Sequence, residues 1–190
     1  VFNSLTDAVN AVIAMKSHGI PLLRCELLDE ASVDAYNNYS DQKLDVAPTL
    51  FLEFQSFNAT SLDEQIRQAE LICKDDGEAK TFDTSRGRKT SEDLWKARHQ
   101  LYYAALASRP GADGAIVTDV CVPLSQFARV LEETVEDVME SDVVGPCFGH
   151  VGDGNVHCIM PVCEEDYDKE SGYFDQLQGI QERLMQRALD

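Results

Sequence analysis

The sequence has few basic residues and no long apolar run. It carries 16 Lys and Arg against 34 Asp and Glu, which gives a formal net charge of −18. Such a surface repels phosphate groups, so neither nucleic-acid binding nor binding to an anionic membrane is expected. No run approaches the roughly 20 apolar residues that cross a bilayer, so no integral membrane segment is expected either. The hydrophobic content of 44% is typical of a globular domain.

The sequence has no Cys-x-x-Cys pair, and no signal peptide is expected in the residues that open it. Half of its six cysteines lie in apolar, strand-like runs, where Cys behaves as a small hydrophobe. We therefore expect reduced thiols and a reducing compartment instead of a disulfide framework. The chain opens at Val1 without an initiator Met or a basic leader, which we interpret as the start of a fragment of a longer protein.

Hydrophobic periodicity predicts helices and strands in near alternation. The predicted helices cover residues 5–18, 29–39, 61–74, 90–107, 124–138 and 164–190. The predicted strands cover residues 21–28, 49–55, 79–83 and 115–122, followed by a hairpin over 144–162. Alternation alone favours a parallel α/β sheet. However, the hairpin must be antiparallel and no Gly-rich phosphate loop follows a strand, so an α+β domain fits equally well.

The most informative segment is Gly149–His157, with the sequence GHVGDGNVH. Its turn-forming residues are Gly152, Asp153, Gly154 and Asn155. If these four residues form the loop of the hairpin, His150 lies directly opposite His157. Opposed positions share a face with Cβ atoms about 4.5–5.5 Å apart, so both imidazoles can reach one divalent cation. The segment therefore predicts two ligands of a zinc or manganese site that still needs another ligand.

Two other interpretations of the hairpin stay open. The histidines can simply flank a turn and hydrogen-bond to the backbone. A structural zinc site could instead use Cys147, Cys158 or Cys163. Strand alternation opposes this second interpretation, because it places Cys147 and Cys158 on the sheet face opposite the histidines.

The predicted helix over residues 90–107 carries a second candidate group. Arg98 and Tyr102 are four residues apart and therefore share a face of this helix. Arginine can hold a carboxylate through two parallel hydrogen bonds, so Arg98 and Tyr102 are candidate substrate-binding residues. Considered alone, Arg98 is more often a solvated charge and Trp95 a core residue.

Several of these segments occur in the same order in a known family. They are Glu26–Asp29 (ELLD), Leu94–His99 (LWKARH), Thr118–Pro123 (TDVCVP) and Gly149–His157. With them the chain resembles the flavin-dependent oxidases and dehydrogenases that include mitochondrial D-lactate dehydrogenase and the glycolate oxidase flavin subunit. The resemblance spans nearly the whole chain, and the hairpin is its most specific part.

The resemblance implies a fold and a set of roles. Residues 1–190 would form most of an α+β, ferredoxin-like substrate (cap) domain, with an antiparallel or mixed sheet flanked by helices. FAD would be bound by a separate domain that precedes this chain. His150 and His157 would be metal ligands, and Arg98 would bind the substrate carboxylate. The family's third ligand and catalytic base would follow Asp190, so no catalytic residue is assigned within the chain.

The function implied is the substrate- and metal-binding part of a flavin-dependent D-2-hydroxyacid dehydrogenase of the D-lactate or glycolate type. Its partners would be a small 2-hydroxy acid and the FAD-binding domain of the same protein. Its location would be mitochondrial in a eukaryote and cytoplasmic otherwise. The alternatives are a non-catalytic metal-binding module and a ferredoxin-like interaction domain.

Two apolar positions indicate the size of the substrate. Relatives that act on 2-hydroxyglutarate carry Lys at the position of Val117 and Asn at the position of Ile159. The apolar residues here remove groups that could pair with a second carboxylate, which favours a short monocarboxylate. The competing interpretation is that both are core positions.

Overall fold

The computed structural model describes residues 1–40, 43–168 and 172–190. Its helices are α1 (Leu5–Ser17), α2 (Glu30–Tyr39), α3 (Ala59–Asp75), α4 (Arg88–Ala107), α5 (Leu124–Met139) and α6 (Tyr173–Leu189), with a short 3-10 helix η1 (Glu164–Tyr167). Its strands are β1 (Arg24–Leu28), β2 (Thr49–Glu53), β3 (Gly114–Val117), β4 (Val120–Cys121), β5 (Cys147–His150) and β6 (Asn155–Val162). None of the helices that the structure describes is long and apolar enough to cross a membrane.

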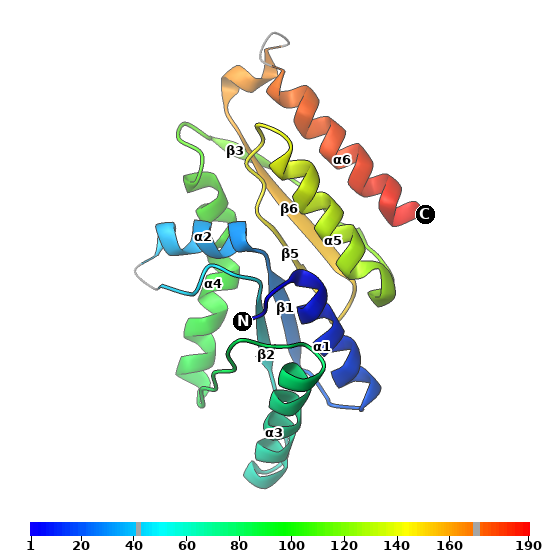
Figure 1. Ribbon diagram of the computed structural model, residues 1–190. Helices are drawn as coiled ribbons and strands as arrows, with labels where there is room; N and C mark the ends of the chain where they lie inside the picture. Colours follow the sequence, from blue (N-terminus) through cyan, green and yellow to red (C-terminus); the bar gives the residue numbers. More distant parts are fainter. Residues whose placement is uncertain (41–42, 169–171) are drawn as a thin grey trace.

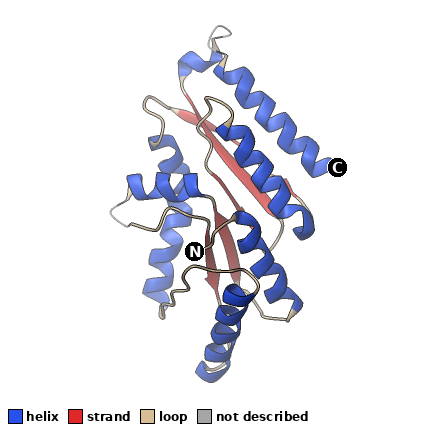
Figure 2. Ribbon diagram, viewed as in Figure 1, coloured by secondary structure: helices blue, strands red, loops and turns tan. Residues whose placement is uncertain are grey.

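The strands form one sheet in the order β2-β1-β5-β6-β3, with β4 also paired to β6 (Figures 1 and 2). Each pairing in the described residues is antiparallel. The α+β fold class is therefore confirmed, and the parallel arrangement suggested by alternation alone is wrong. The helix between β1 and β2 does not make a parallel crossover, because the chain returns along β2 antiparallel to β1.

Helices cover both faces of the sheet, and the strands are apolar on both faces as a result. Leu27 of β1 faces a large core that contains residues of α1, α5 and α6. Its neighbour Leu28 faces a smaller core formed with α2 and α4, which also contains Phe148. Strand alternation thus assigns successive residues to two different layers.

Local signals explain the ends of the first helix. The Ser4 side chain accepts a hydrogen bond from the backbone N–H of Asp7 at 3.0 Å, which caps α1. The helix ends at Ser17, and Gly19 follows with φ +71°, a conformation that glycine adopts without strain. The prediction for this helix is confirmed to within one residue.

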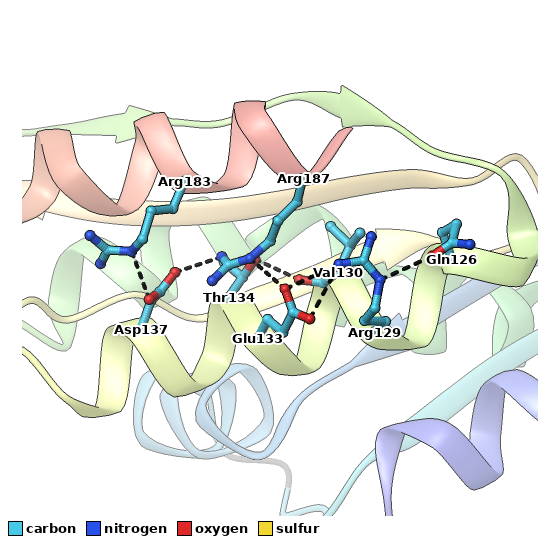
Figure 3. A network of polar contacts seen from close by, with 8 residues as sticks. All are labelled: Gln126, Arg129, Val130, Glu133, Thr134, Asp137, Arg183 and Arg187. Carbon is cyan, nitrogen blue, oxygen red and sulfur yellow. Dashed lines mark hydrogen bonds and ion pairs between the residues drawn. The ribbon is translucent and has the colours of Figure 1, made fainter. Parts of the chain in front are cut away.

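The helices α5 and α6 are joined by a network of ion pairs, drawn in Figure 3. Arg187 of α6 lies between Glu133 and Asp137 of α5, and its Nε atom is 2.7 Å from Glu133. Arg183 reaches Asp137 at 2.7 Å from a more exposed position. This network holds the last helix against the domain.

Two predicted strands differ from the observed structure. Residues 79–83 form a loop, because their backbone pairs with the N-terminus: Lys80 donates to the Val1 carbonyl at 2.9 Å, and the Val1 amino group donates to the Thr81 carbonyl at 3.1 Å. The predicted strand over 115–122 is interrupted between β3 and β4. The predicted last helix is η1 followed by α6, and residues 169–171 between them lie outside the described part of the chain.

The interruption has a specific cause at Thr118. Its hydroxyl accepts the N–H of Cys158 at 2.8 Å, and its own N–H donates to the Cys158 carbonyl at 3.0 Å. The hydroxyl thus takes the place of the backbone carbonyl in the ladder. The Thr118 carbonyl is left free to accept a hydrogen bond from another group.

Candidate metal and substrate site

The register of the β5–β6 hairpin brings the two candidate histidines together. His150 pairs with Asn155, and Phe148 pairs with His157, so the turn occupies residues 151–154. The predicted loop over 152–155, and with it the direct opposition of the histidines, is wrong by one residue. The two imidazoles are diagonal neighbours on the same face instead, and their ring centroids are 5.4 Å apart.

The turn is displaced by one residue because Val151 is an apolar core residue. Its side chain is fully buried in the large core. The N–H groups of Asp153 and Gly154 both donate to the His150 carbonyl, at 2.9 and 3.0 Å. Gly154 has φ +84°, and a Cβ there would lie 2.1 Å from the Val122 carbonyl oxygen. Only glycine fits this close approach.

The other glycines of the motif are also in close contact with their surroundings. A Cβ on Gly149 would lie 2.3 Å from the Asn155 carbonyl oxygen across the hairpin. The Gly152 carbonyl accepts a hydrogen bond from the Lys16 ammonium group of α1. The hairpin is therefore held by neighbouring elements on both sides of its turn.

His150 is oriented by a buried carboxylate. Its Nδ1 atom forms a short hydrogen bond to Oε1 of Glu26, a residue of β1 that is 5% exposed. A carboxylate accepts hydrogen bonds, so the imidazole donates from Nδ1 and keeps its lone pair on Nε2.

His157 is oriented by the carbonyl that the strand interruption releases. Its Nδ1 atom lies 3.1 Å from the Thr118 carbonyl oxygen, so this ring also donates from Nδ1. Burial lowers the pKa of His157 below its usual value. Both the tautomer and the lowered pKa favour a neutral imidazole whose Nε2 atom can bind a metal.

Arg98 of α4 lies beside this pair. Its Nε atom donates to Glu26 Oε2 at 2.9 Å, and its Nη2 atom is 3.3 Å from His150 Nε2. The guanidinium carbon is 4.5 Å from the centroid of the Phe148 ring. The stack and the ion pair fix the plane of the guanidinium group.

The other residues noted on this helix lie further from the histidines. Tyr102 is one turn beyond Arg98, is partly exposed, and packs edge-on against Tyr103 with centroids 5.6 Å apart. Trp95 is buried against Phe51 of β2, which agrees with a core residue.

The two histidines suit part of a metal site. Two imidazoles bound to one ion at about 2.0–2.1 Å per nitrogen have ring centroids roughly 4.5–5.5 Å apart. The observed 5.4 Å between His150 and His157 fits this range. Across the residues that the structure describes, no three His, Cys, Asp or Glu side chains gather as a metal-binding group. The chain thus presents two nitrogen donors, and a complete site needs donors from elsewhere.

The cysteines are arranged for packing. Cys147 and Cys158 pair across the hairpin on the face opposite the histidines, as strand alternation predicts. All six cysteines, each in the described part of the chain, are free thiols, and five of them are buried. Burial raises the pKa of the Cys73 thiol to about 11, which keeps it protonated and unreactive at neutral pH.

Three residues of this site lie in segments that carry the family resemblance, but the sequence assigned no role in the site to any of them. Glu26 and Thr118 orient the histidines, and Asp119 accepts a hydrogen bond from the Asn155 amide at 2.9 Å. The Asn155 Oδ1 atom is buried without a hydrogen-bond partner, so it offers a further acceptor beside His150. The available signal for Glu26 was a charged residue in an otherwise apolar strand, which requires a partner.

Comparison with known proteins identifies the family. The family model described as FAD linked oxidases, C-terminal domain, matches residues 1–188. The chain is 38% identical over 188 residues to a protein of Danio rerio named probable D-lactate dehydrogenase, mitochondrial, covering 99% of this chain and 36% of that protein. It is 27% identical to the glycolate oxidase subunit GlcD of Bacillus subtilis, covering 86% of this chain and 33% of that protein.

A solved structure agrees with the fold. The chain matches an alkyldihydroxyacetonephosphate synthase with a TM-score of 0.58 at 11% identity, covering 98% of this chain and 39% of that chain. The chain therefore spans about a third of the length of the curated relatives described above, and somewhat more of this structure. It belongs to the family of FAD linked oxidases and corresponds to their C-terminal domain.

Proposed function

We propose that this chain is the substrate- and metal-binding part of a flavin-dependent D-2-hydroxyacid dehydrogenase of the D-lactate or glycolate type. The observation that carries the proposal is the arrangement of His150 and His157 beside Arg98. Both rings donate from Nδ1 to fixed acceptors, and the guanidinium group lies within 3.3 Å of His150 Nε2. The names of relatives such as the D. rerio protein support the reaction class.

The Nε2 atoms of His150 and His157 would hold the metal ion. Bound zinc or manganese would polarise the substrate hydroxyl as a Lewis acid, and FAD, bound mainly by another domain, would accept the hydride. The histidines need no rearrangement of their tautomers to present these nitrogens, because the Glu26 carboxylate and the Thr118 carbonyl already fix them.

Arg98 would bind the substrate carboxylate. Its Nε atom is occupied by Glu26, so the carboxylate would approach the Nη atoms on the side of His150. A 2-hydroxy acid carries its carboxylate and hydroxyl on adjacent carbons. A site with a guanidinium group next to a metal-binding imidazole can hold both groups at once. Tyr102, on the same helix, is proposed as a second substrate contact.

The substrate is proposed to be a short monocarboxylate. Val117 pairs with Ile159 across β3 and β6, on the face that carries His157. Val117 is 45% exposed, whereas Ile159 is 3% exposed and belongs to the smaller core. Discrimination against a second carboxylate would therefore rest on Val117, since an unpaired carboxylate beside an apolar group would lose hydration at a cost of several kcal/mol.

The cellular setting is proposed from the relatives. Relatives from D. rerio and Arabidopsis thaliana are named as mitochondrial enzymes. We place this protein in the same compartment in a eukaryote, and in the cytoplasm otherwise. Its partners would be the 2-hydroxy acid and the FAD-binding domain of the same protein.

The test uses the complete flavoprotein. D-Lactate should bleach the flavin under anaerobic conditions, and D-2-hydroxyglutarate should do so with a much lower kcat/KM. Extraction of the metal with a chelator, His150→Ala and His157→Ala should each abolish bleaching and reduce the bound metal. His18→Ala is the matched control, because His18 is an exposed imidazole at the end of α1. Full metal content and full bleaching in both site variants would refute the proposal.

A further inference from the structure

Glu26 is the only carboxylate among the described residues that contacts both His150 and Arg98. It comes from the middle of β1, between Cys25 and Leu27, whose side chains pack in the large core on the opposite face. Each of its oxygens has a different partner: Oε1 accepts from the imidazole and Oε2 from the guanidinium group. Three elements that are distant in the sequence therefore meet at one buried side chain.

The first contact determines which nitrogen of His150 can bind a metal. A carboxylate can only accept here, so it selects the tautomer with the proton on Nδ1 and leaves Nε2 with its lone pair. It also makes the imidazole a better electron donor, as carboxylates behind ligating histidines do. An amide at this position could present its NH2 group to Nδ1, which would move the imidazole proton to Nε2 and block the ligand position.

The second contact determines the orientation of Arg98. The pair with Glu26 uses Nε and neither Nη atom, and Nη2 lies 3.3 Å from His150 Nε2. A bidentate pair would instead tie both Nη atoms to one carboxylate. The ring of Phe148 lies under the guanidinium group and fixes its plane. Glu26 therefore holds Arg98 without closing it to a second carboxylate.

We infer that Glu26 is a positioning residue that sets the metal-binding tautomer of His150 and the substrate-binding orientation of Arg98 together. This inference rests on the proposed function. One substitution at this position should therefore impair two separate properties, the affinity for the metal and the KM for the 2-hydroxy acid.

The chain contains a matched control. Asp166 forms an ion pair with Arg109, and the two side chains are 6% and 18% exposed, against 7% and 20% for Glu26 and Arg98. This second pair lies beyond the end of α4, near Pro161 at the far end of β6 from the hairpin turn. Asp166→Asn should lower stability without affecting the metal or the substrate.

The experiment compares Glu26→Gln with Asp166→Asn in the complete flavoprotein. Zinc affinity is measured by competition with a chromophoric chelator, and the histidine tautomers are read from imidazole ¹⁵N shifts, assigned with His150→Ala and His157→Ala. Glu26→Gln should weaken zinc binding about 10- to 100-fold and move the His150 proton from Nδ1 to Nε2. The tautomer of His157 should not change, since its partner is the Thr118 carbonyl. The KM for D-lactate should rise at least tenfold, and Asp166→Asn should match the parent in all three measurements.

Other results would overturn the inference. If Glu26→Gln changes only the thermal unfolding midpoint, as Asp166→Asn is expected to do, Glu26 is a structural residue. If Glu26→Gln does not fold, Glu26→Asp replaces it, because the shorter carboxylate cannot span both partners; unchanged zinc affinity and KM in that variant contradict the inference. Failure of the proposed function looks different, because His150→Ala and His157→Ala would then bind zinc as well as the parent does.

Discussion

Two arginine–carboxylate pairs are buried in this molecule, one with its arginine in the helix α4 and one with its arginine just after that helix. They differ in how many guanidinium nitrogens bind the carboxylate. Arg109 places both of its Nη atoms on the two oxygens of Asp166. Arg98 gives only its Nε atom to Glu26, whose second oxygen binds His150. Both guanidinium groups stack on an aromatic ring and both pairs are similarly buried.

The difference separates a structural pair from the binding group that we propose. Arg109 also donates to the Pro161 carbonyl at 2.9 Å, and Asp166 accepts the N–H of Cys163 at 2.6 Å. These contacts tie the start of the segment after β6 to the end of α4. Arg98 gives Glu26 only one donor and directs its Nη2 atom at His150 Nε2. The two pairs therefore differ in how many donors the arginine commits to its carboxylate, and this difference supports the binding role proposed for Arg98.

The largest expected effect comes from exchanging each arginine for lysine. Lysine is a point charge that cannot hold Glu26 and a substrate carboxylate in fixed geometry. Arg98→Lys should lower kcat/KM for D-lactate by roughly 10²–10³-fold, the loss of about two charged hydrogen bonds. Arg109→Lys should change kcat/KM less than about threefold while lowering the thermal unfolding midpoint. The measurement is steady-state kinetics of both variants. Similar losses of kcat/KM in the two would contradict the comparison.

A smaller effect concerns pH and a third buried carboxylate, Asp29, whose partners are the N–H groups of Ser32 and Cys147. Burial raises the pKa of Asp29 to about 6, whereas the hydrogen bonds from Arg109 lower the pKa of Asp166. Because the pKa of Asp29 is higher in the folded state than in the unfolded state, the folded state binds protons more tightly at this group. The contribution of Asp29 is therefore fully present below pH 4 and is lost as the pH rises through about 6, by up to about 3 kcal/mol. Asp166 has the opposite sign, since its contribution is present above pH 4 and is lost on acidification.

The measurement is urea unfolding at pH 4 and pH 6.5. The free energy of unfolding of the parent relative to Asp29→Asn should fall between pH 4 and 6.5. The same difference taken with Asp166→Asn should not fall over this range. If both differences in unfolding free energy change with pH in the same way, a neighbouring arginine does not determine whether a buried carboxylate stabilises the protein at low or at high pH.

The smallest effect tests the same contrast on the surface, in the network of Figure 3. Arg187 is 16% exposed and contacts both Glu133 and Asp137, whereas Arg183 is 50% exposed and contacts Asp137. Arg183→Ala should cost at most about 0.5 kcal/mol of unfolding free energy. Arg187→Ala should cost about 1–2 kcal/mol, because Glu133 and the partly buried Asp137 each lose one of their two arginine partners. If both variants lose the same unfolding free energy in urea, the burial of an arginine and the number of its ion-pair partners do not determine its contribution here.

Much of the fold was predictable because its signals are local. The cap at Ser4 and the glycine after α1 specify the backbone within a few residues, and the observed helix agrees closely. The GHVGDGNVH segment predicted a turn, which the structure places one residue earlier. The antiparallel hairpin left both fold classes open, and the resemblance to the family favoured the α+β class. Arg98 was singled out because the LWKARH segment resembles a helix of the family, whereas its spacing and chemistry alone favoured a solvated charge.

The remaining features depend on packing between distant segments. Val151 shifts the turn by one residue because it is buried in the core, which no turn propensity encodes. The Thr118 hydroxyl replaces its own carbonyl in the ladder only because Cys158 lies opposite. Residues 79–83 have a strand-like sequence, but the fold places them beside the N-terminus. Their backbone therefore hydrogen-bonds to Val1 and does not join the sheet.

The interruption between β3 and β4 has a consequence for how this protein folds. The group that orients His157 is 39 residues away in the sequence, and the group that orients His150 is 124 residues away. Such non-local contacts form only after the entropy of closing long loops has been overcome, which places them late in folding. A peptide of the hairpin alone would keep both imidazoles but lose both acceptors. The geometry of the two imidazoles is therefore acquired with the last strand pairings, and a metal bound at the proposed site would report on completed folding.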